Sequence, residues 1–270
     1  MTTVLKLGGS VVTKKDEPET VDRAALDAAA AAVGGFDGDL VAVHGGGSFG
    51  HPAAAERGVS ATEGSRDARD AVAVHDAMGR LNAAVVERLA DHGVAALPVR
   101  PLSVAHRNID GDLSVPTGSV EAMLAEGFTP VLHGDVVVHE GSGVTVTSGD
   151  DLVVTLAESL GADRVGLCST VSGVLDAEGT VISRIDRFED VAAAVGDSDA
   201  TDVTGGMAAK VRKLLALPAP AHVFGPEGLT AFLDGESPGT TVAGGPADDG
   251  GDAGGHEGDA LGEGGESWGE

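Results

Sequence analysis

The sequence is poor in basic residues. Of its 270 residues, 17 are lysine or arginine and 43 are aspartate or glutamate, which gives a formal net charge of −26. A protein that binds duplex DNA or RNA needs a concentrated basic face to neutralise phosphates, and binding to an anionic membrane surface makes the same demand. The composition therefore argues against nucleic acid and membrane partners.

Cysteine and long apolar runs are also scarce. The one cysteine, Cys168, excludes an internal disulfide framework and a cysteine-rich zinc module. No apolar stretch approaches the roughly 18 residues that a membrane-spanning helix requires. The residues after Met1 do not resemble a signal peptide, because glycines and charges follow too soon. We therefore expect a soluble, cytoplasmic protein.

Lysine is rare even among the basic residues, with five copies against 12 arginines. Excess acid with little lysine suits a salt-rich cytoplasm, in which carboxylates keep a protein hydrated, so the composition indicates a halophilic source. The lysines form two groups beside glycine pairs: Lys6, Lys14 and Lys15, then Lys210 and Lys213. A chance grouping of solvated side chains is the simpler explanation, but scarce lysines beside glycines favour a function.

Apolar, β-rich runs alternate with alanine-rich helical stretches along the chain. This alternation predicts an α/β fold, an open αβα sandwich with a mostly parallel central sheet and helices on both faces. Strands are expected at 3–7, 40–44, 94–99, 129–132, 164–168 and 221–224, with an edge strand at 240–242; helices are expected at 21–33, 67–92, 118–125, 150–160, 207–217 and 226–233. Two hairpins interrupt the pattern, pairing 136–139 with 144–147 and 173–175 with 180–182.

The composition changes at about Ala243. The last 28 residues contain 11 glycines, eight acidic residues and no basic residue. Such a segment cannot bury enough apolar surface to offset the entropy of ordering. We expect one folded domain over residues 1–242 and a disordered, acidic, glycine-rich tail over residues 243–270.

Three glycine-rich turns are expected in front of helices. They contain Gly8-Gly9, Gly45-Gly46-Gly47 and Gly205-Gly206. Bare glycines let backbone N–H groups approach anionic oxygens, and a helix N-terminus adds partial positive charge. One glycine pair is usually just a tight turn, but three such turns, two of them beside lysines, predict a phosphate site. The carboxyl ends of strands in a doubly wound sheet meet at one edge, so the first two turns can face the same ligand.

Two common nucleotide-binding patterns are missing. The sequence has no G-x-x-x-x-G-K-[ST] and no convincing G-x-G-x-x-G that opens a βαβ unit. The lysines are therefore left to neutralise charge on a transferring phosphoryl group and its neighbours.

Four motifs, in their order and spacing, resemble those of the amino acid kinase superfamily across nearly the whole folded region. They are Lys6-Leu7-Gly8-Gly9-Ser10, His44-Gly45-Gly46-Gly47, Ser148-Gly149-Asp150-Asp151 and Asp202-Val203-Thr204-Gly205-Gly206-Met207 with Lys210. Within the superfamily, the chain is most similar to the archaeal isopentenyl phosphate kinases, because His51 follows Gly45-Gly46-Gly47-Ser48-Phe49-Gly50 and Lys15 follows Thr13.

This resemblance implies transfer of the γ-phosphoryl group of ATP to isopentenyl phosphate, giving isopentenyl diphosphate and ADP for isoprenoid synthesis. It implies that Lys6, Lys15 and Lys210 hold the nucleotide phosphates and the transferring group, and that Asp150 orients the lysines. Backbone contacts around ATP are implied for Gly8, Gly9, Ser10, Gly46, Gly205 and Gly206. The substrate phosphate is expected among Gly45, Gly50, His51 and Gly149, with His51 counted as catalytic beside the three lysines. A homodimer is also implied.

Several assignments remain open at this point. A slip of one residue exchanges Lys14 and Lys15, and His51 also fits a surface histidine in a loop. Asp150-Asp151 fits a metal pair, but such a pair more often caps a helix, here together with Ser148. Magnesium would then arrive with ATP, held by phosphate oxygens and water. No histidine spacing indicates a protein-built metal site. His44 and His133 either line the site or pack in the core.

Two other functions remain as alternatives. One is another kinase of the superfamily, with a carboxylate, carbamate, phosphonate or nucleotide monophosphate as acceptor. The other is a non-catalytic sensor that binds a nucleotide. The sensor predicts lost lysines, whereas all the motif lysines are present.

Overall fold

The computed structural model describes residues 1–195 and 206–243. An eight-stranded sheet lies at its centre, in the order β10-β12-β11-β9-β1-β2-β6-β3. Its strands are β1 (Thr2–Leu7), β2 (Asp39–His44), β3 (Ala96–Pro98), β6 (Thr129–His133), β9 (Arg164–Cys168), β10 (Arg184–Ile185), β11 (Ala221–Phe224) and β12 (Thr240–Val242). Every neighbouring pair is parallel except β11 with β12. The predicted mostly parallel sheet is confirmed.

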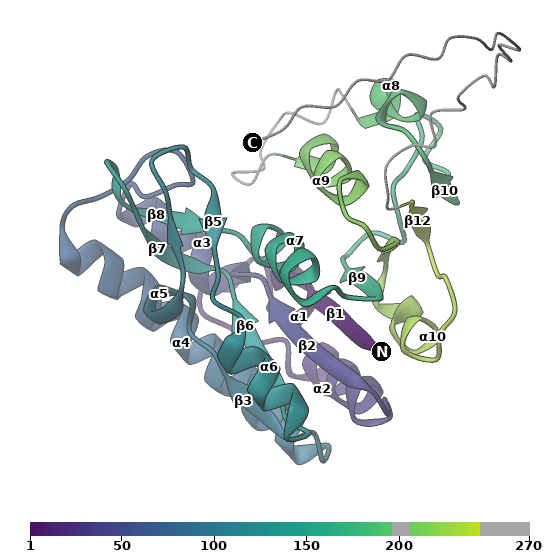
Figure 1. The fold of residues 1–270 in the computed structure, drawn as a ribbon, viewed down its shortest axis with the longest axis horizontal. Helices are drawn as coiled ribbons and strands as arrows, with labels where there is room; N and C mark the ends of the chain where they lie inside the picture. The colour runs from purple at the N-terminus through teal and green to yellow at the C-terminus, as the bar shows by residue number, and fades with distance from the viewer. Residues whose placement is uncertain (196–205, 244–270) are drawn as a thin grey trace, which may run out of the picture.

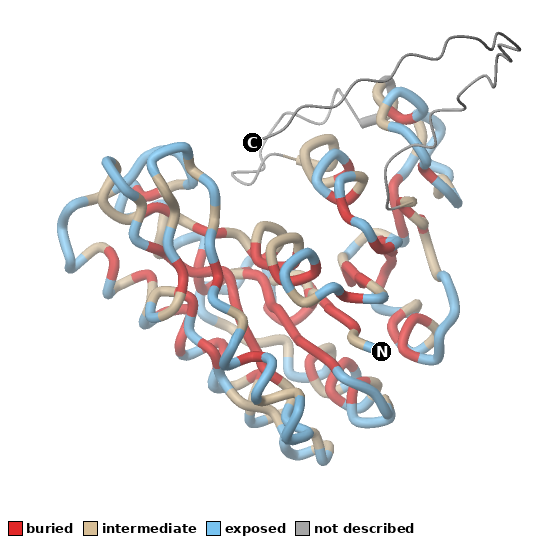
Figure 2. Tube along the Cα trace, viewed as in Figure 1, coloured by how far each residue is buried: buried red, intermediate tan, exposed pale blue. Residues whose placement is uncertain are grey.

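Helices cover both faces of this sheet, as predicted (Figure 1). One face packs against α1 (Gly9–Val12), α2 (Arg23–Gly34), α4 (Ala68–Asp91) and α10 (Leu229–Leu233); the other packs against α6 (Gly118–Ala125), α7 (Gly149–Leu160) and α9 (Gly206–Leu215). Successive side chains of a strand alternate between the faces, so Leu5 and Leu7 join the first layer while Val4 joins the second. Lys6 therefore points to the side of α7 and α9. Figure 2 shows β1 and β2 buried between the two layers.

A second sheet stands where β6 ends. It has the order β5-β4-β7-β8, with β4 (His106–Arg107), β5 (Leu113–Ser114), β7 (Asp135–His139) and β8 (Gly143–Thr147). The first predicted hairpin is thus confirmed as β7–β8, but it belongs to this separate sheet. Val136 of β7 joins a small apolar cluster with Val59, Ala71 and Val74. The sheet lies beside α3 (Gly47–Glu56) and α5 (Pro101–Val104) (Figure 1).

Some predicted elements differ in the structure. The second hairpin is reduced to one bridge between Leu175 and Val181, and its turn is closed by Asp176, whose N–H donates to Thr180 O and whose Oδ1 accepts from the N–H groups of residues 178 and 180. Strand β12 is not an edge strand, since β10 pairs with its outer side. The helix expected at 226–233 is a 3₁₀ turn, Pro226–Gly228, followed by α10; a further 3₁₀ turn, Phe188–Asp190, and helix α8 (Ala192–Val195) complete the described elements.

The acidic tail lies outside the described residues from Gly244 onward, so the domain boundary at 242 stays a prediction. Within the described residues, no helix is both long and apolar enough to cross a membrane.

Candidate active site

The first two glycine turns contact each other backbone to backbone. They follow β1 and β2, which are parallel neighbours and end at the same edge of the sheet. A Cβ added to Gly9 would lie 2.1 Å from Gly47 N, and one added to Gly45 would lie 2.6 Å from Gly9 N. Glycine is therefore required here for the approach of two main chains, whatever ligand also binds.

Not all of the expected backbone donors are available. Gly8 N–H donates to Cys168 O at 2.8 Å, and Gly45 N–H donates to Leu7 O at 3.0 Å. These two N–H groups attach the turns to the sheet. Backbone N–H donors for a phosphate must therefore come from other residues of the two turns. Ser10 lies in the short helix α1 directly after Gly9.

A lysine–aspartate cluster forms on the α7 side of the sheet. Lys6 Nζ lies 2.7 Å from Asp150 Oδ1, and Lys210 Nζ lies 3.8 Å from Asp150 Oδ2. Gly149 makes room for this contact, because a Cβ there would lie 3.1 Å from Lys6 Cε. The structure thus brings together Lys6, Gly149, Asp150 and Lys210, from β1, α7 and α9.

Asp150 is ionised in this cluster. Burial alone raises the pKa of the Asp150 carboxyl, but the positive charges of Lys6 and Lys210 outweigh it, so the pKa lies below its usual value. All three side chains are at most 20% exposed, so their charges are poorly screened by water. Two ammonium groups are held by one carboxylate next to the glycine turns, which is a suitable arrangement for binding a polyanion.

Asp151 holds a second pair of cations that the sequence did not predict. Arg107 Nη2 lies 2.9 Å from Asp151 Oδ2, and Lys213 Nζ contacts Asp151 Oδ1. Ser148 and Asp151 also form a reciprocal capping box at the start of α7, which confirms the capping interpretation of this segment. Lys213 was detectable, because it follows Lys210 by one helical turn, whereas nothing in the sequence singles out Arg107.

Lys15 and His51 are exposed, and within the described residues neither side chain forms a hydrogen bond or ion pair with the cluster. Lys15 lies in the turn after Thr13, where its neighbour Lys14 pairs with Glu17 at 3.2 Å. His51 is in the second turn of α3, not in a loop; the chain enters this helix at Gly47, which has a φ of +47°. Gly50 is packed under α4, since a Cβ there would lie 2.6 Å from Met78 Sδ.

The third glycine turn is only partly described. Gly206, with a φ of +65°, begins α9, whereas Gly205 lies outside the described residues.

A buried row of histidines lies behind the glycine turns, which settles that His44 and His133 pack in the interior. The two rings stack with centroids 5.5 Å apart, and both side chains are at most 1% exposed. His75 of α4 contacts the buried carboxylate of Asp135 at 2.8 Å, and this hydrogen bond raises the pKa of His75. Burial lowers the pKa of His133, and burial together with His133 lowers the pKa of His44 to about 3.

The neutral state of His44 predicts a loss of stability in acid. The unfolded chain takes up a proton below about pH 6.5, whereas folded His44 resists it down to about pH 3, so stability is complete above 6.5 and falls through this window. We expect His44 alone to make the free energy of unfolding about 2 kcal/mol lower at pH 5 than at pH 7. Denaturant unfolding of wild type and His44→Gln at both pH values measures this. An equal pH dependence in the two proteins would contradict it.

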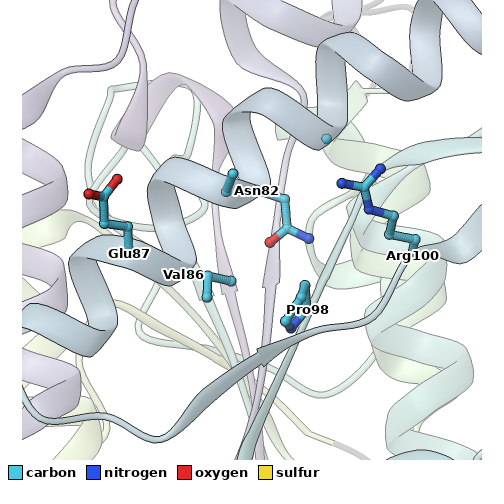
Figure 3. Close-up of a pocket in the computed structure, with 7 residues that line it drawn as sticks. Asn82, Val86, Glu87, Pro98 and Arg100 are labelled. Atoms are coloured by element: carbon cyan, nitrogen blue, oxygen red, sulfur yellow. The ribbon is translucent and has the colours of Figure 1, made fainter.

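A pocket of about 290 Å³ lies away from the glycine turns, between α4 and the edge strand β3. Asn82 and Val86 of α4 point toward Pro98 there, while the Glu87 carboxylate points away from them (Figure 3). One of its lining residues, Arg100, is basic. None of the residues predicted to bind ATP or the acceptor lines this pocket, so the candidate site remains at the ends of β1 and β2.

Known proteins resemble this chain in sequence and in fold. The model of the amino acid kinase family matches residues 1–219. The isopentenyl phosphate kinase of Haloferax volcanii is 68% identical over 243 residues, covering 89% of this chain and 98% of that protein. That of Methanocaldococcus jannaschii is 31% identical, covering 78% and 85%. A solved structure described as that of isopentenyl phosphate kinase superposes with a TM-score of 0.76 at 27% identity, covering 90% of this chain and all of that one.

Proposed function

This chain belongs to the amino acid kinase family, and we propose that it is an isopentenyl phosphate kinase, which uses ATP to convert isopentenyl phosphate into isopentenyl diphosphate. The observation that carries the proposal is the 68% identity to the Haloferax volcanii enzyme of that name over nearly all of that protein's length. The cluster of Lys6, Asp150 and Lys210 at the carboxyl ends of parallel strands supports the same type of reaction.

Phosphoryl transfer between two phosphates requires cations and N–H donors rather than a general base. A phosphate monoester is already a nucleophile near pH 7, and the obstacle is the repulsion between two polyanions. We assign Lys6, Lys15 and Lys210 to the nucleotide phosphates and the transferring group, with Asp150 holding Lys6 and Lys210 in place. The turn residues assigned to ATP are Gly8, Gly9, Ser10, Gly46, Gly205 and Gly206. The acceptor phosphate is assigned to Gly45, Gly50, His51 and Gly149. Because the N–H groups of Gly8 and Gly45 are engaged by the sheet, these two glycines are assigned for the close approach that the missing side chain allows.

The isoprenoid tail needs an apolar surface close to His51. Helix α3 continues from His51 into Ala53 and Ala54, which pack on the buried cluster of Val59, Val74 and Val136. We assign the tail to this side of α3, where α4 and the second sheet meet it.

Magnesium fits this arrangement as an ion that arrives with ATP. The two carboxylates nearest the lysines are already engaged, Asp150 by Lys6 and Lys210, and Asp151 by Arg107 and Lys213. Phosphate oxygens and water would therefore supply most of its ligands, as is common for this ion. When bound, it would neutralise part of the triphosphate charge beside the lysines.

An ADP-release assay tests the activity. We expect turnover with isopentenyl phosphate, compared under the same conditions with dimethylallyl phosphate, fosfomycin, carbamate, glutamate and UMP. Turnover of UMP or glutamate with none of the isoprenoid phosphates would overturn the assignment. ATP binding without turnover of any acceptor would favour the nucleotide sensor.

We further propose a homodimeric, cytoplasmic enzyme from a salt-rich cell, with the acidic tail serving solubility. Ending the chain at Val242 removes eight acidic residues and takes the formal net charge from −26 to −18. We expect unchanged activity at high salt, where screening removes any repulsion between tail and substrate, but lower solubility. The test is to measure the activity and the solubility limit of the full-length and the truncated protein under the same conditions. Lost turnover at high salt would assign the tail to the catalytic machinery.

A further inference from the structure

The segment that carries Lys15 is attached to the start of α3 through one residue, Ser48. Ser48 Oγ accepts from Thr20 N–H at 3.3 Å and donates to Thr20 O at 3.4 Å, while Ser48 O accepts from Glu19 N–H at 3.0 Å. The carbonyl is free for this bond because its helical partner would be residue 52, and Pro52 has no N–H. The C-terminal end of the Lys15 turn is thereby fixed to the helix of His51.

Thr13 makes the connection on the other side of Lys15. Its hydroxyl donates to Gly9 O at 2.8 Å and accepts from Ser48 N–H at 3.0 Å, so it joins the two glycine turns directly. Thr13 is 2% exposed and Ser48 is 4% exposed. Gly47 is required for this contact, because a Cβ there would lie 2.1 Å from Thr13 Oγ1.

The far end of the turn is held in an unfavourable conformation. Glu19 has a φ of +48°, a region that residues other than glycine rarely adopt, and its carboxylate pairs with Arg80 of α4 at 2.5 Å. Such strain persists only where the surrounding contacts determine the conformation. Tertiary contacts therefore hold the end of this turn at Glu19, in addition to the local bond from Lys14 N–H to Thr20 O at 2.9 Å.

We propose that Thr13 and Ser48 are positioning residues that fix Lys15 relative to His51 during phosphoryl transfer. The inference rests on the proposed function, in which Lys15 serves the donor and His51 the acceptor. Lys15 follows Thr13 by two residues and His51 follows Ser48 by three, so the hydroxyl-to-amide bond between Thr13 and Ser48 sets their separation. Neither residue touches a substrate in this scheme; both act through Lys15.

Thr13→Val tests the proposal, because it keeps the shape of the side chain and removes both hydrogen bonds. We expect kcat to fall roughly ten- to hundredfold, the scale of a small misplacement of a reacting group, with KM for either substrate changed less than about threefold. Thr13→Ser should restore most of the rate. Thr240→Val is the matched control: Thr240 is equally buried and accepts from Val174 N–H at 2.8 Å, but lies on β12. Thr240→Val should lower the free energy of unfolding about as much as Thr13→Val does, but it should leave kcat unchanged.

The Lys15→Ala background separates positioning from structure. If Thr13 acts through Lys15, adding Thr13→Val to Lys15→Ala should cost little further rate. If Thr13→Val does not fold, Ser48→Ala, which cannot overpack the site, tests the other attachment: it removes the hydroxyl bonds to Thr20 and keeps the N–H bond to Thr13. An equal loss in both backgrounds, or a loss no larger than that of Thr240→Val, would overturn the positioning role. A wild-type protein inactive on isopentenyl phosphate would instead overturn the proposed function.

Discussion

Replacing Lys210 by alanine is expected to lower kcat by roughly a hundredfold or more, the scale of one preorganised electrostatic donor. The Lys210 ammonium lies 3.8 Å from Asp150, beside Lys6, where it can meet charge that develops on the transferring phosphoryl group. Because this charge grows only as transfer proceeds, kcat should fall more than KM for ATP rises. Steady-state kinetics at saturating ATP measure both parameters.

Lys213→Ala is the matched control for this variant. It removes the same side chain one turn further along α9, where the ammonium contacts Asp151 and not Asp150. A much smaller loss of kcat is expected. If Lys213→Ala were as damaging as Lys210→Ala, the whole of α9 and not one ammonium would be responsible.

Lys15→Ala belongs to the same prediction, with an expected loss of kcat of similar size. Lys14→Ala serves as its control, because the Lys14 ammonium is engaged by Glu17 at 3.2 Å. A large loss in Lys14→Ala and none in Lys15→Ala would exchange the two residues. Near-normal kcat in both Lys15→Ala and Lys210→Ala would remove the roles given to these lysines.

The second large effect is expected on kcat/KM when His51 is replaced by alanine. A charge-assisted hydrogen bond from imidazole to the acceptor phosphate contributes about 1.5–3 kcal/mol. The variant should therefore lose roughly ten- to over a hundredfold in kcat/KM for isopentenyl phosphate. His51→Gln retains an N–H donor without the charge and should fall between wild type and alanine. His51 is exposed in the second turn of α3, so its loss leaves no buried hole.

Equilibrium binding separates the acceptor side from the donor side. His51→Ala should bind ATP as wild type does, but bind isopentenyl phosphate more weakly. His92→Ala is a control for removing a partly exposed histidine, since His92 pairs with Asp27 at the C-terminal end of α4. If His51→Ala lost ATP binding and kept acceptor binding, His51 would belong to the donor side.

Much of the fold was predictable because its signals are local. Residues 118–125 and 164–168 have the predicted bounds, since alternation of apolar runs and turn residues marks where an element begins and ends. The glycines after β1 and β2, and the lysines beside them, can be recognised directly in the sequence. The cluster of Lys6, Asp150 and Lys210 was predicted from the resemblance, because Lys6 and Asp150 are 144 positions apart and no spacing rule connects them.

The alternation of strands and helices was enough to predict one mostly parallel sheet, which the structure confirms, and the glycine turns predict phosphate-binding chemistry at the ends of its strands. The contacts that those residues make follow from how distant segments pack together. Strands of two residues, such as β4 and β5, have no period to detect, so the sequence predicted the β7–β8 hairpin of the second sheet but neither β4 and β5 nor the pairing of Arg107 with Asp151. Likewise, Gly9 and Gly45 are glycine because two turns from different strands meet there, and Thr13 reaches Ser48 across 35 positions. Such contacts depend on how the crossovers bring strands side by side, which no local pattern encodes.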